Sequence, residues 1–501
     1  MRFTSLIVEL IRARPYLVFW LASLALALIW VIVPLVVYAG PPDGVASVLA
    51  FGREYRMGTA LGPPLAYWLA DIAYRAAGSH IVGVYVLAQI CSVVTFWAVF
   101  MLGRAIVGGP HAALAVLLTV TVLSFSYPGV AFGPQILAQP LWALALLYAW
   151  RVFGQGRRNA WFALSIVAGL LLLTTTSATL LLVLLLVFAL ATERGRRALA
   201  SIDPVLALIV IAVLAGPYVV WLVRAQMFVL PPAPSPDLLQ ARIAGWSRDV
   251  ALMLLGLAGI AILVVLNLTL RRDRDPPAIT RHAVTSEGRL FVAFFALAPP
   301  FLFSLPGALF ADTRYSVGTG TMLALSGLAV ILFSGDIIHL RRQRMLRAVW
   351  AALIAAPVAW VMLLALGQPL TSGSYLTTSL PARDISRFFA DSFERRTGRP
   401  LPAVAGDPQL AALVALAAPA RPHLFLDASP QLTPWQSAER FSQTGGVVVW
   451  YAADTGGAPP EEIARRFPGL VPELPHSFSR LLQGRQPPLR VGWSIIRPKN
   501  P

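Results

Sequence analysis

Carboxylates and arginines gather in the polar segments that separate long apolar runs of this chain. The carboxylates in these segments are Asp43, Glu54, Asp71, Asp237, Asp249 and Asp312. The arginines beside them are Arg53, Arg56, Arg75, Arg224, Arg242, Arg248 and Arg314. The planar guanidinium group of arginine suits phosphate oxygens, and a carboxylate can remove a proton from a hydroxyl. The combination predicts a site that holds a lipid-linked phosphate while a carboxylate activates an acceptor hydroxyl.

Residues 39–80 form the richest of these segments. A Gly-Pro-Pro triplet at 40–42 should end the preceding helix and set Asp43 at the membrane edge. The stretch GVASVLAFGREYRMG, residues 44–58, predicts a helix that lies on the membrane surface. Interfacial aromatic side chains belong at headgroup depth, and those expected there are Tyr67, Trp68 and Tyr74.

Other catalytic patterns are missing from the sequence. It has no His-x-x-x-His, Cys-x-x-Cys, P-loop or Gly-x-Ser-x-Gly motif, which argues against a zinc hydrolase, an ATPase and a serine hydrolase. The single cysteine, Cys91, falls inside an apolar run, so the chain has neither a disulfide framework nor a thiolate metal site. The sequence supports no cofactor, no metal site and no divalent cation.

The apolar runs must position these residues, and they indicate an integral membrane protein. The 501 residues are 57% hydrophobic and 13% charged, with a mean hydropathy of +0.71. Runs of about 18 to 20 apolar residues are long enough to cross a bilayer as helices. The predicted spans are 15–38, 81–103, 110–126, 134–153, 160–175, 177–192, 204–223, 248–270, 289–310, 316–334 and 346–366. We therefore expect an all-α polytopic membrane protein with about eleven transmembrane helices.

The net charge of +17 does not point to nucleic acid, because the positive residues are distributed as in a membrane protein. Basic clusters at 151–158, 193–197, 271–274 and 339–347 all fall on the cytoplasmic side if the N-terminus is cytoplasmic. There they would meet anionic membrane lipids. The expected location is a bacterial inner membrane, with residues 39–80 in the periplasm.

The chain changes character after about residue 368, where apolar runs shrink to strand length. RDISRFFADSFERR, residues 383–396, predicts an amphipathic helix. PHLFLD, GGVVVWYA and LRVGWSII predict strands, and PPEEIARRF predicts a short helix. We expect two domains: residues 1–368 in the membrane, and residues 369–501 as a small α/β domain in the periplasm.

The order of these features resembles the C superfamily of membrane glycosyltransferases. Within it, the chain looks most like the branch of protein mannosyltransferases, aminoarabinose transferases and lipopolysaccharide galacturonosyltransferase-like proteins. Asp43 matches an aspartate early in the first outer loop of that branch, and PPLAYWL, residues 63–69, matches a later Pro-Pro-Leu motif. Residues 140–182 and the stretch ADTRYSVGTGTMLAL, residues 311–325, are similar to the middle and late regions of the family.

The resemblance implies an inverting transfer of a sugar from a polyprenyl-phosphate donor to a lipid, glycan or protein acceptor at the periplasmic face of the membrane. In such a cell-envelope enzyme Asp43 would be the general base, with Glu54 or Asp71 as substitutes. The donor phosphate would be bound by Arg53, Arg56 and Arg314. The sugar or prenyl path would be lined by Tyr67, Trp68 and Tyr315.

Four polar positions of the family pattern are replaced in this sequence, by Gly44, Gly62, Gln135 and Thr175. Because glycine supplies no metal ligand, metal-assisted donor binding loses support. The replacements also motivate a second hypothesis, in which the protein binds a lipid-linked saccharide or scaffolds an envelope assembly without catalysis. A transporter or flippase is a third hypothesis, but charges within the predicted spans are almost absent.

Overall fold

The computed structural model describes residues 3–58, 61–127, 129–225, 236–269, 277–310, 318–371, 376–426, 433–452, 456–479 and 488–499. The chain divides into two compact units. Unit 1 comprises residues 1–31, 86–129 and 134–359, and unit 2 comprises residues 32–85, 130–133 and 360–501.

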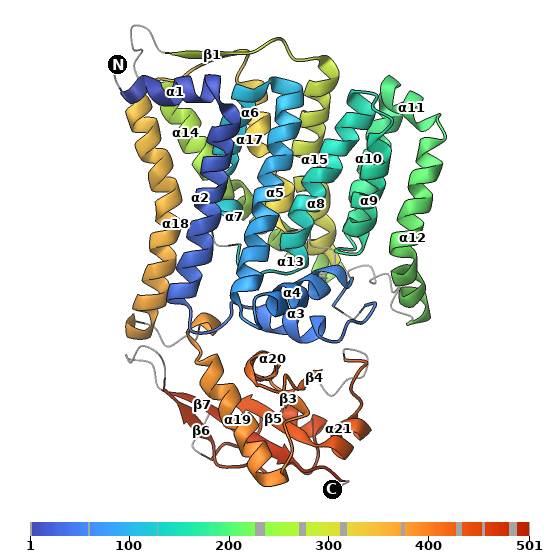
Figure 1. The fold of residues 1–501 in the computed structure, drawn as a ribbon, viewed down its shortest axis with the longest axis vertical. Helices are drawn as coiled ribbons and strands as arrows, with labels where there is room; N and C mark the ends of the chain where they lie inside the picture. Colours follow the sequence, from blue (N-terminus) through green and yellow to red (C-terminus); the bar gives the residue numbers. More distant parts are fainter. Residues whose placement is uncertain are drawn as a thin grey trace. The chain divides into compact units, whose positions relative to one another are not determined.

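Unit 1 is built from helices, most of which run side by side in Figure 1. Three of them, α2, α5 and α18, also contribute residues to unit 2. The helices are α1 (Phe3–Ala13), α2 (Pro15–Val37), α5 (Val82–Val107), α6 (Gly109–Thr119), α7 (Leu123–Ser126), α8 (Pro134–Ala149) with a π-helical turn η1 (Trp150–Gly154), α9 (Ala160–Leu172), α10 (Ala178–Ala191), α11 (Glu193–Leu199), α12 (Asp203–Arg224), α13 (Pro236–Gly256), α14 (Ala258–Thr269), α15 (Ser286–Phe310), α16 (Thr319–Leu323), α17 (Ser326–Phe333) and α18 (Gln343–Thr371).

Five helices of the described residues are long and apolar enough to cross a membrane, and seven segments qualify if each of two bent helix pairs is one span. The five are Pro15–Val37, Val82–Val107, Pro134–Gly154, Asp203–Arg224 and Gln343–Gly367. All five coincide with predicted spans, and the chain is a multi-pass membrane protein. The total of eleven spans stays a prediction.

The two bent pairs refine the predicted boundaries. The chain turns by 111° between α10 and α11, where Thr192 caps α11 by accepting a hydrogen bond from the Gly195 amide. The second pair, α13 and α14, bends by 49°. Helix α13 begins at Pro236, so part of the stretch expected to be an outer loop before residue 248 is helical.

A short antiparallel ribbon links the polar ends of unit 1 helices. Strand β1 (Ala278–Thr280) pairs with β2 (Ile337–His339). The buried guanidinium group of Arg281 follows β1, pairs with Asp336 at 3.0 Å and donates to the carbonyls of Ile331 and Leu332. These contacts cap the carboxyl end of α17, where a positive charge is favourable.

Unit 2 contains a five-stranded mixed sheet with the strand order β4-β3-β5-β7-β6. Strand β5 pairs with β3 in parallel and with β7 in the antiparallel direction. The strands are β3 (Ala403–Gly406), β4 (His423–Leu426), β5 (Gly446–Tyr451), β6 (His476–Phe478) and β7 (Leu489–Ile496). The helices are α3 (Val45–Gly52), α4 (Leu65–Ala76), a 3-10 turn η3 (Thr377–Ser379), α19 (Ala382–Thr397), α20 (Pro408–Ala417), α21 (Ala438–Thr444) and α22 (Glu461–Arg466).

The elements predicted after residue 368 are confirmed, because α19, β4, β5, α22 and β7 coincide with the sequence patterns that predicted them. The strands β3 and β6 are additional. Residues 32–85, which include the first loop region 39–80, belong to the same compact unit as the sheet. The boundary between residues 368 and 369 therefore stays a prediction.

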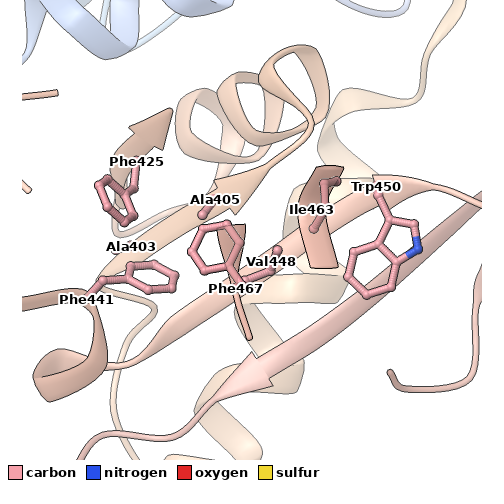
Figure 2. Close-up of a cluster of buried hydrophobic side chains, with 8 residues drawn as sticks. All are labelled: Ala403, Ala405, Phe425, Phe441, Val448, Trp450, Ile463 and Phe467. Atoms are coloured by element: carbon pink, nitrogen blue, oxygen red, sulfur yellow. The ribbon is translucent and has the colours of Figure 1, made fainter. Parts of the chain in front are cut away.

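One face of the sheet is covered by an aromatic cluster, shown in Figure 2. Trp450 on β5 is fully buried, and its indole N–H donates to the Gly457 carbonyl at 3.2 Å. Helix α22 adds Ile463 to the same cluster. The remaining members are Ala403, Ala405, Phe425, Phe441, Val448 and Phe467.

Replacing Trp450 with alanine should destabilise unit 2, because burial of a large aromatic side chain is lost and a cavity is left. Large-to-small changes of this kind cost about 3–5 kcal/mol. We expect a lower apparent Tm for Trp450→Ala in thermal unfolding of the purified full-length protein. Trp360→Ala, at a position that is 55% exposed, is the matched control. Equal Tm values for the two variants would contradict the assigned core.

Candidate functional site

The two helices of the first loop region, α3 and α4, pack tightly within unit 2. Seven of the eight residues of α3 are buried. A Cβ atom on Gly52 would lie 2.1 Å from the Tyr67 carbonyl oxygen, so only glycine permits this approach. The close contact brings the segment after α3, which contains Arg53, Glu54 and Tyr55, against α4.

Asp71 on α4 is the centre of the site, because its side chain is fully buried and bears three polar contacts. Arg75, one helical turn later, places Nε 2.6 Å from Asp71 Oδ2. The hydroxyl of Tyr55 donates to the same oxygen at 3.0 Å. Burial and this hydrogen bond raise the pKa of Tyr55. Burying a carboxylate without partners would be costly, and these contacts offset that cost for Asp71.

The third partner of Asp71 comes from the C-terminal part of the chain. Arg421 Nη2 lies 2.8 Å from Asp71 Oδ1, an ion pair that is too oblique to count as a hydrogen bond. The same nitrogen donates to the Leu49 carbonyl of α3 at 3.4 Å. The Arg421 guanidinium also lies over the ring of Tyr74, 5.0 Å from its centroid. Arg421 thereby contacts α3, α4 and the carboxylate between them.

A second contact joins the same parts of unit 2. Nδ1 of His423, the first residue of β4, lies 2.6 Å from Glu54 Oε1. The Glu54 carboxylate is almost completely buried. The packing of Phe51 on Trp435, with ring centroids 5.1 Å apart, adds an apolar contact nearby in the chain. The first loop region and the sheet are therefore connected by the Asp71–Arg421 ion pair, the Glu54–His423 contact and one aromatic contact.

Two guanidinium nitrogens in this cluster are buried without a hydrogen-bond partner among the described residues. They are Arg53 Nη1 and Arg421 Nε. Burial lowers the pKa of Arg53, and the positive charges of Arg421 and Arg75 lower it further, whereas Glu54 and Asp71 act in the opposite direction. Buried N–H groups are normally satisfied, so unpaired donors of this kind suit an anionic ligand.

The other predicted residues of the first loop differ in their exposure and contacts. Asp43 is exposed just before α3 and forms no ion pair within the described part of the chain. Arg56 is exposed, and its carbonyl accepts a hydrogen bond from the Trp68 indole at 3.1 Å. Tyr67 is buried, with its ring 6.0 Å from that of Phe51. The predicted residues Arg314 and Tyr315 lie outside the described residues.

The residues that replace the family's polar positions have local structural explanations. Gly44 and Gly62 have φ values of +79° and +132°, which side chains of other residues rarely adopt. The loop backbone therefore requires glycine at both positions. In unit 1, Thr175 is buried and its hydroxyl donates to Ser177 at 3.2 Å, whereas Gln135 is exposed near the start of α8.

The described residues contain no group of three or more histidine, cysteine, aspartate or glutamate side chains that could hold a metal ion. The chemistry of the cluster also argues for an anion, because Asp71 is already paired with Arg75 and Arg421 and Glu54 already contacts His423.

Sequence reasoning missed Arg421 and His423. His423 lies in the predicted strand PHLFLD and Arg421 directly precedes it. No spacing in the sequence connects them to Asp71 or Glu54, which lie about 350 residues earlier. The composition of the first loop gives no signal either, because it carries three arginines and three acidic residues.

The sequence and the fold of this chain are similar to those of known proteins. Residues 62–221 match the sequence model of the dolichyl-phosphate-mannose-protein mannosyltransferases. The structure of ArnT from Cupriavidus metallidurans bound to undecaprenyl phosphate aligns with a TM-score of 0.59 and 14% identity, covering 95% of this chain and 97% of that chain. The chain therefore has the fold of ArnT.

The predicted resemblance is thus confirmed. The apo structure of the same ArnT aligns with a TM-score of 0.55 and 14% identity, again over 95% of this chain and 97% of that chain. No curated protein matches the sequence directly. The segment that matches the mannosyltransferase model begins at Gly62, so it includes Asp71 and Arg75 but neither Asp43 nor Arg421.

Replacing Asp71 with asparagine should destabilise unit 2 strongly, because Arg421 and Arg75 would lose their shared counter-charge. Breaking a buried ion pair by removing one partner costs about 3–5 kcal/mol. We expect the apparent Tm of Asp71→Asn to fall by at least about 5 °C. The exposed Asp384→Asn in the same unit is the matched control.

The double variant Asp71→Asn/Arg421→Gln should lose less stability than the sum of its two single variants, because the residues are in direct contact. Additive losses, or an Asp71→Asn variant as stable as Asp384→Asn, would show that this ion pair does not hold the site together.

Proposed function

We propose that the protein is a membrane glycosyltransferase that takes a sugar from a polyprenyl-phosphate donor. The observation that carries this proposal is the pair of buried, unpartnered guanidinium donors, Arg53 Nη1 and Arg421 Nε. They occur in a chain whose fold matches that of ArnT, and one ArnT structure contains undecaprenyl phosphate. A phosphate group would satisfy both donors.

The charge balance of the cluster supports a phosphate ligand. Arg53, Arg75 and Arg421 surround one buried carboxylate, Asp71, which leaves an excess of positive charge. The carboxylate of Glu54 offsets part of this excess, and three guanidinium groups against two carboxylates still leave one positive charge. A buried positive cluster favours a bound phosphate and also stabilises the negative charge that develops on the phosphate as it leaves.

Asp43 is the proposed general base. Its carboxylate is exposed and has no ion-pair partner among the described residues, whereas Glu54 and Asp71 are engaged. Asp43 would accept the proton of the acceptor hydroxyl as the acceptor oxygen forms a bond to C1 of the sugar. The bond between C1 and the phosphate oxygen breaks, and the phosphate leaves with the electron pair. Attack from the opposite face inverts the configuration at C1.

The remaining predicted residues take supporting roles in this proposal. The exposed side chain of Arg56 and the half-exposed Trp68 are available to a lipid or sugar group. Tyr67 is buried and would act by positioning Phe51 and the segment that follows. Arg314 and Tyr315 remain proposed contributors to donor binding. The acceptor is a lipid, glycan or protein hydroxyl at the periplasmic face of a bacterial inner membrane, and unit 2 would contribute to its choice.

A second candidate function is binding of a lipid-linked saccharide without transfer. It is favoured by Gly44 and Gly62, which stand where the family pattern has polar side chains. This candidate shares the phosphate site of the first, so donor binding and turnover must be measured separately.

Replacing Asp43 with asparagine should reduce transfer by about 10²–10⁴-fold, the usual contribution of a positioned acid or base. Binding of undecaprenyl phosphate and the apparent Tm should be unchanged, because Asp43 lies outside the ion-pair cluster. The measurement is release of undecaprenyl phosphate from a donor pool of the native membrane, with Asp384→Asn as control. Undiminished transfer by Asp43→Asn would contradict the assignment, and donor binding without turnover by the unmodified protein would favour the second candidate.

Replacing Arg53 with glutamine should weaken binding of undecaprenyl phosphate, because a charge-assisted hydrogen bond is worth about 1.5–3 kcal/mol. That energy corresponds to a dissociation constant raised by about 10- to 100-fold. The exposed Arg387→Gln, in the same unit, controls for a general loss of positive charge. If both variants bind the lipid phosphate as the unmodified protein does, Arg53 is not a phosphate ligand.

A further inference from the structure

Unit 1 contains a separate apolar groove with a cavity volume of about 1110 Å³. Its lining comes from α1, α2, α6, α14, α15, α17, β2 and α18. The volume slightly exceeds the range of about 300–1,000 Å³ that is usual for drug-sized ligands. The proposed transfer reaction uses none of these residues.

The walls of the groove suit hydrocarbon. They include Leu21 and Ala25 of α2, Leu118 of α6 and Val264 of α14. Helix α18 forms another wall, although only 11% of its apolar window is buried within the protein. The Trp350 indole N–H donates to the Leu117 carbonyl at 2.8 Å and attaches the start of α18 to α6. Lipid chains in the bilayer can therefore reach a groove whose shape is held by a specific contact.

One end of the groove is basic. The lining includes His339, Arg341 and Arg347 but no aspartate or glutamate. Arg341 is held in place by two contacts: its amide N–H donates to Asn267 Oδ1 at 3.0 Å, and its Nη1 donates to the Leu268 carbonyl at 3.1 Å. Its Nε is buried and has no hydrogen-bond partner among the described residues.

Comparison with a neighbouring arginine shows that this arrangement is specific. Arg281 also lies near the end of α17, but its guanidinium group pairs with Asp336 and donates to two backbone carbonyls. Arg341 has no carboxylate partner in the described part of the chain. The Gln343 side-chain oxygen is likewise buried without a partner, and the positive end of the α18 dipole begins at this residue. The groove thus offers one unpaired donor, one unpaired acceptor and positive charge beside its apolar walls.

We infer that this groove binds an anionic glycerophospholipid of the bilayer. The acyl chains would fill the apolar walls, and the headgroup phosphate would bind Arg341 and Arg347. Basic pockets between transmembrane helices on the cytoplasmic side are suited to anionic headgroups. The groove meets this condition if the predicted orientation holds, because α1, β1 and the start of α18 lie at the same end of unit 1 (Figure 1).

The inference is tested by native mass spectrometry of the full-length protein purified in a non-ionic detergent and titrated with phosphatidylglycerol or phosphatidylcholine of identical acyl chains. We expect phosphatidylglycerol to bind at least about tenfold more tightly. A parallel titration with inorganic phosphate should show no binding, because the apolar contacts would be missing. Equal retention of the two lipids, or retention of free phosphate at the same affinity, would overturn the inference.

Variants separate the headgroup site from general lipid contact. Arg341→Gln and Arg347→Gln should each lose most of the preference for phosphatidylglycerol, whereas Arg289→Gln, an exposed arginine at the start of α15 and outside the groove lining, should keep it. Ala25→Phe should weaken the binding of both lipids, because the larger side chain fills the groove. If Arg341→Gln proves unstable, the lipid preference of Arg347→Gln alone tests the headgroup site. An undiminished preference in Arg347→Gln and Ala25→Phe would overturn the assignment.

Discussion

The buried carboxylate of Asp71 is the constraint on which the arrangement of unit 2 depends. An ionised carboxylate with no exposure requires counter-charges, and these come from a helical neighbour, Arg75, and from Arg421 in the C-terminal part of the chain. Because Arg421 also contacts Leu49 and lies over Tyr74, a single ion pair joins α3, α4 and the start of β4. The first loop region and the five-stranded sheet therefore act as one unit.

This arrangement also explains how a phosphate site could be preformed. Asp71 holds Arg421 by one nitrogen and leaves its Nε unpaired, while the close packing at Gly52 brings Arg53 into the same cluster. The charges would repel one another without Asp71 at their centre. Asp71 is therefore better suited to positioning the arginines than to removing a proton, which separates its role from that proposed for Asp43.

Much of the fold could be predicted from the sequence because its signals are local. Long apolar runs predicted α2, α5 and α12. The three- to four-residue spacing of Ile385, Phe388, Phe389 and Phe393 predicted α19. The site could be predicted only in part. Arg53, Glu54 and Asp71 are near one another in the chain, but their partners Arg421 and His423 depend on tertiary contacts that leave no local pattern. The basic groove depends on which helices α18 packs against, and hydropathy does not predict helix neighbours.

We propose that a polyprenyl phosphate binds to the cluster around Asp71. The most direct measurement is an experimental structure of the full-length protein with undecaprenyl phosphate. We predict that the phosphate oxygens lie within about 3 Å of Arg53 Nη1 and Arg421 Nε, with both ion pairs of Asp71 retained. A phosphate bound elsewhere, with these two nitrogens still unpaired, would contradict it.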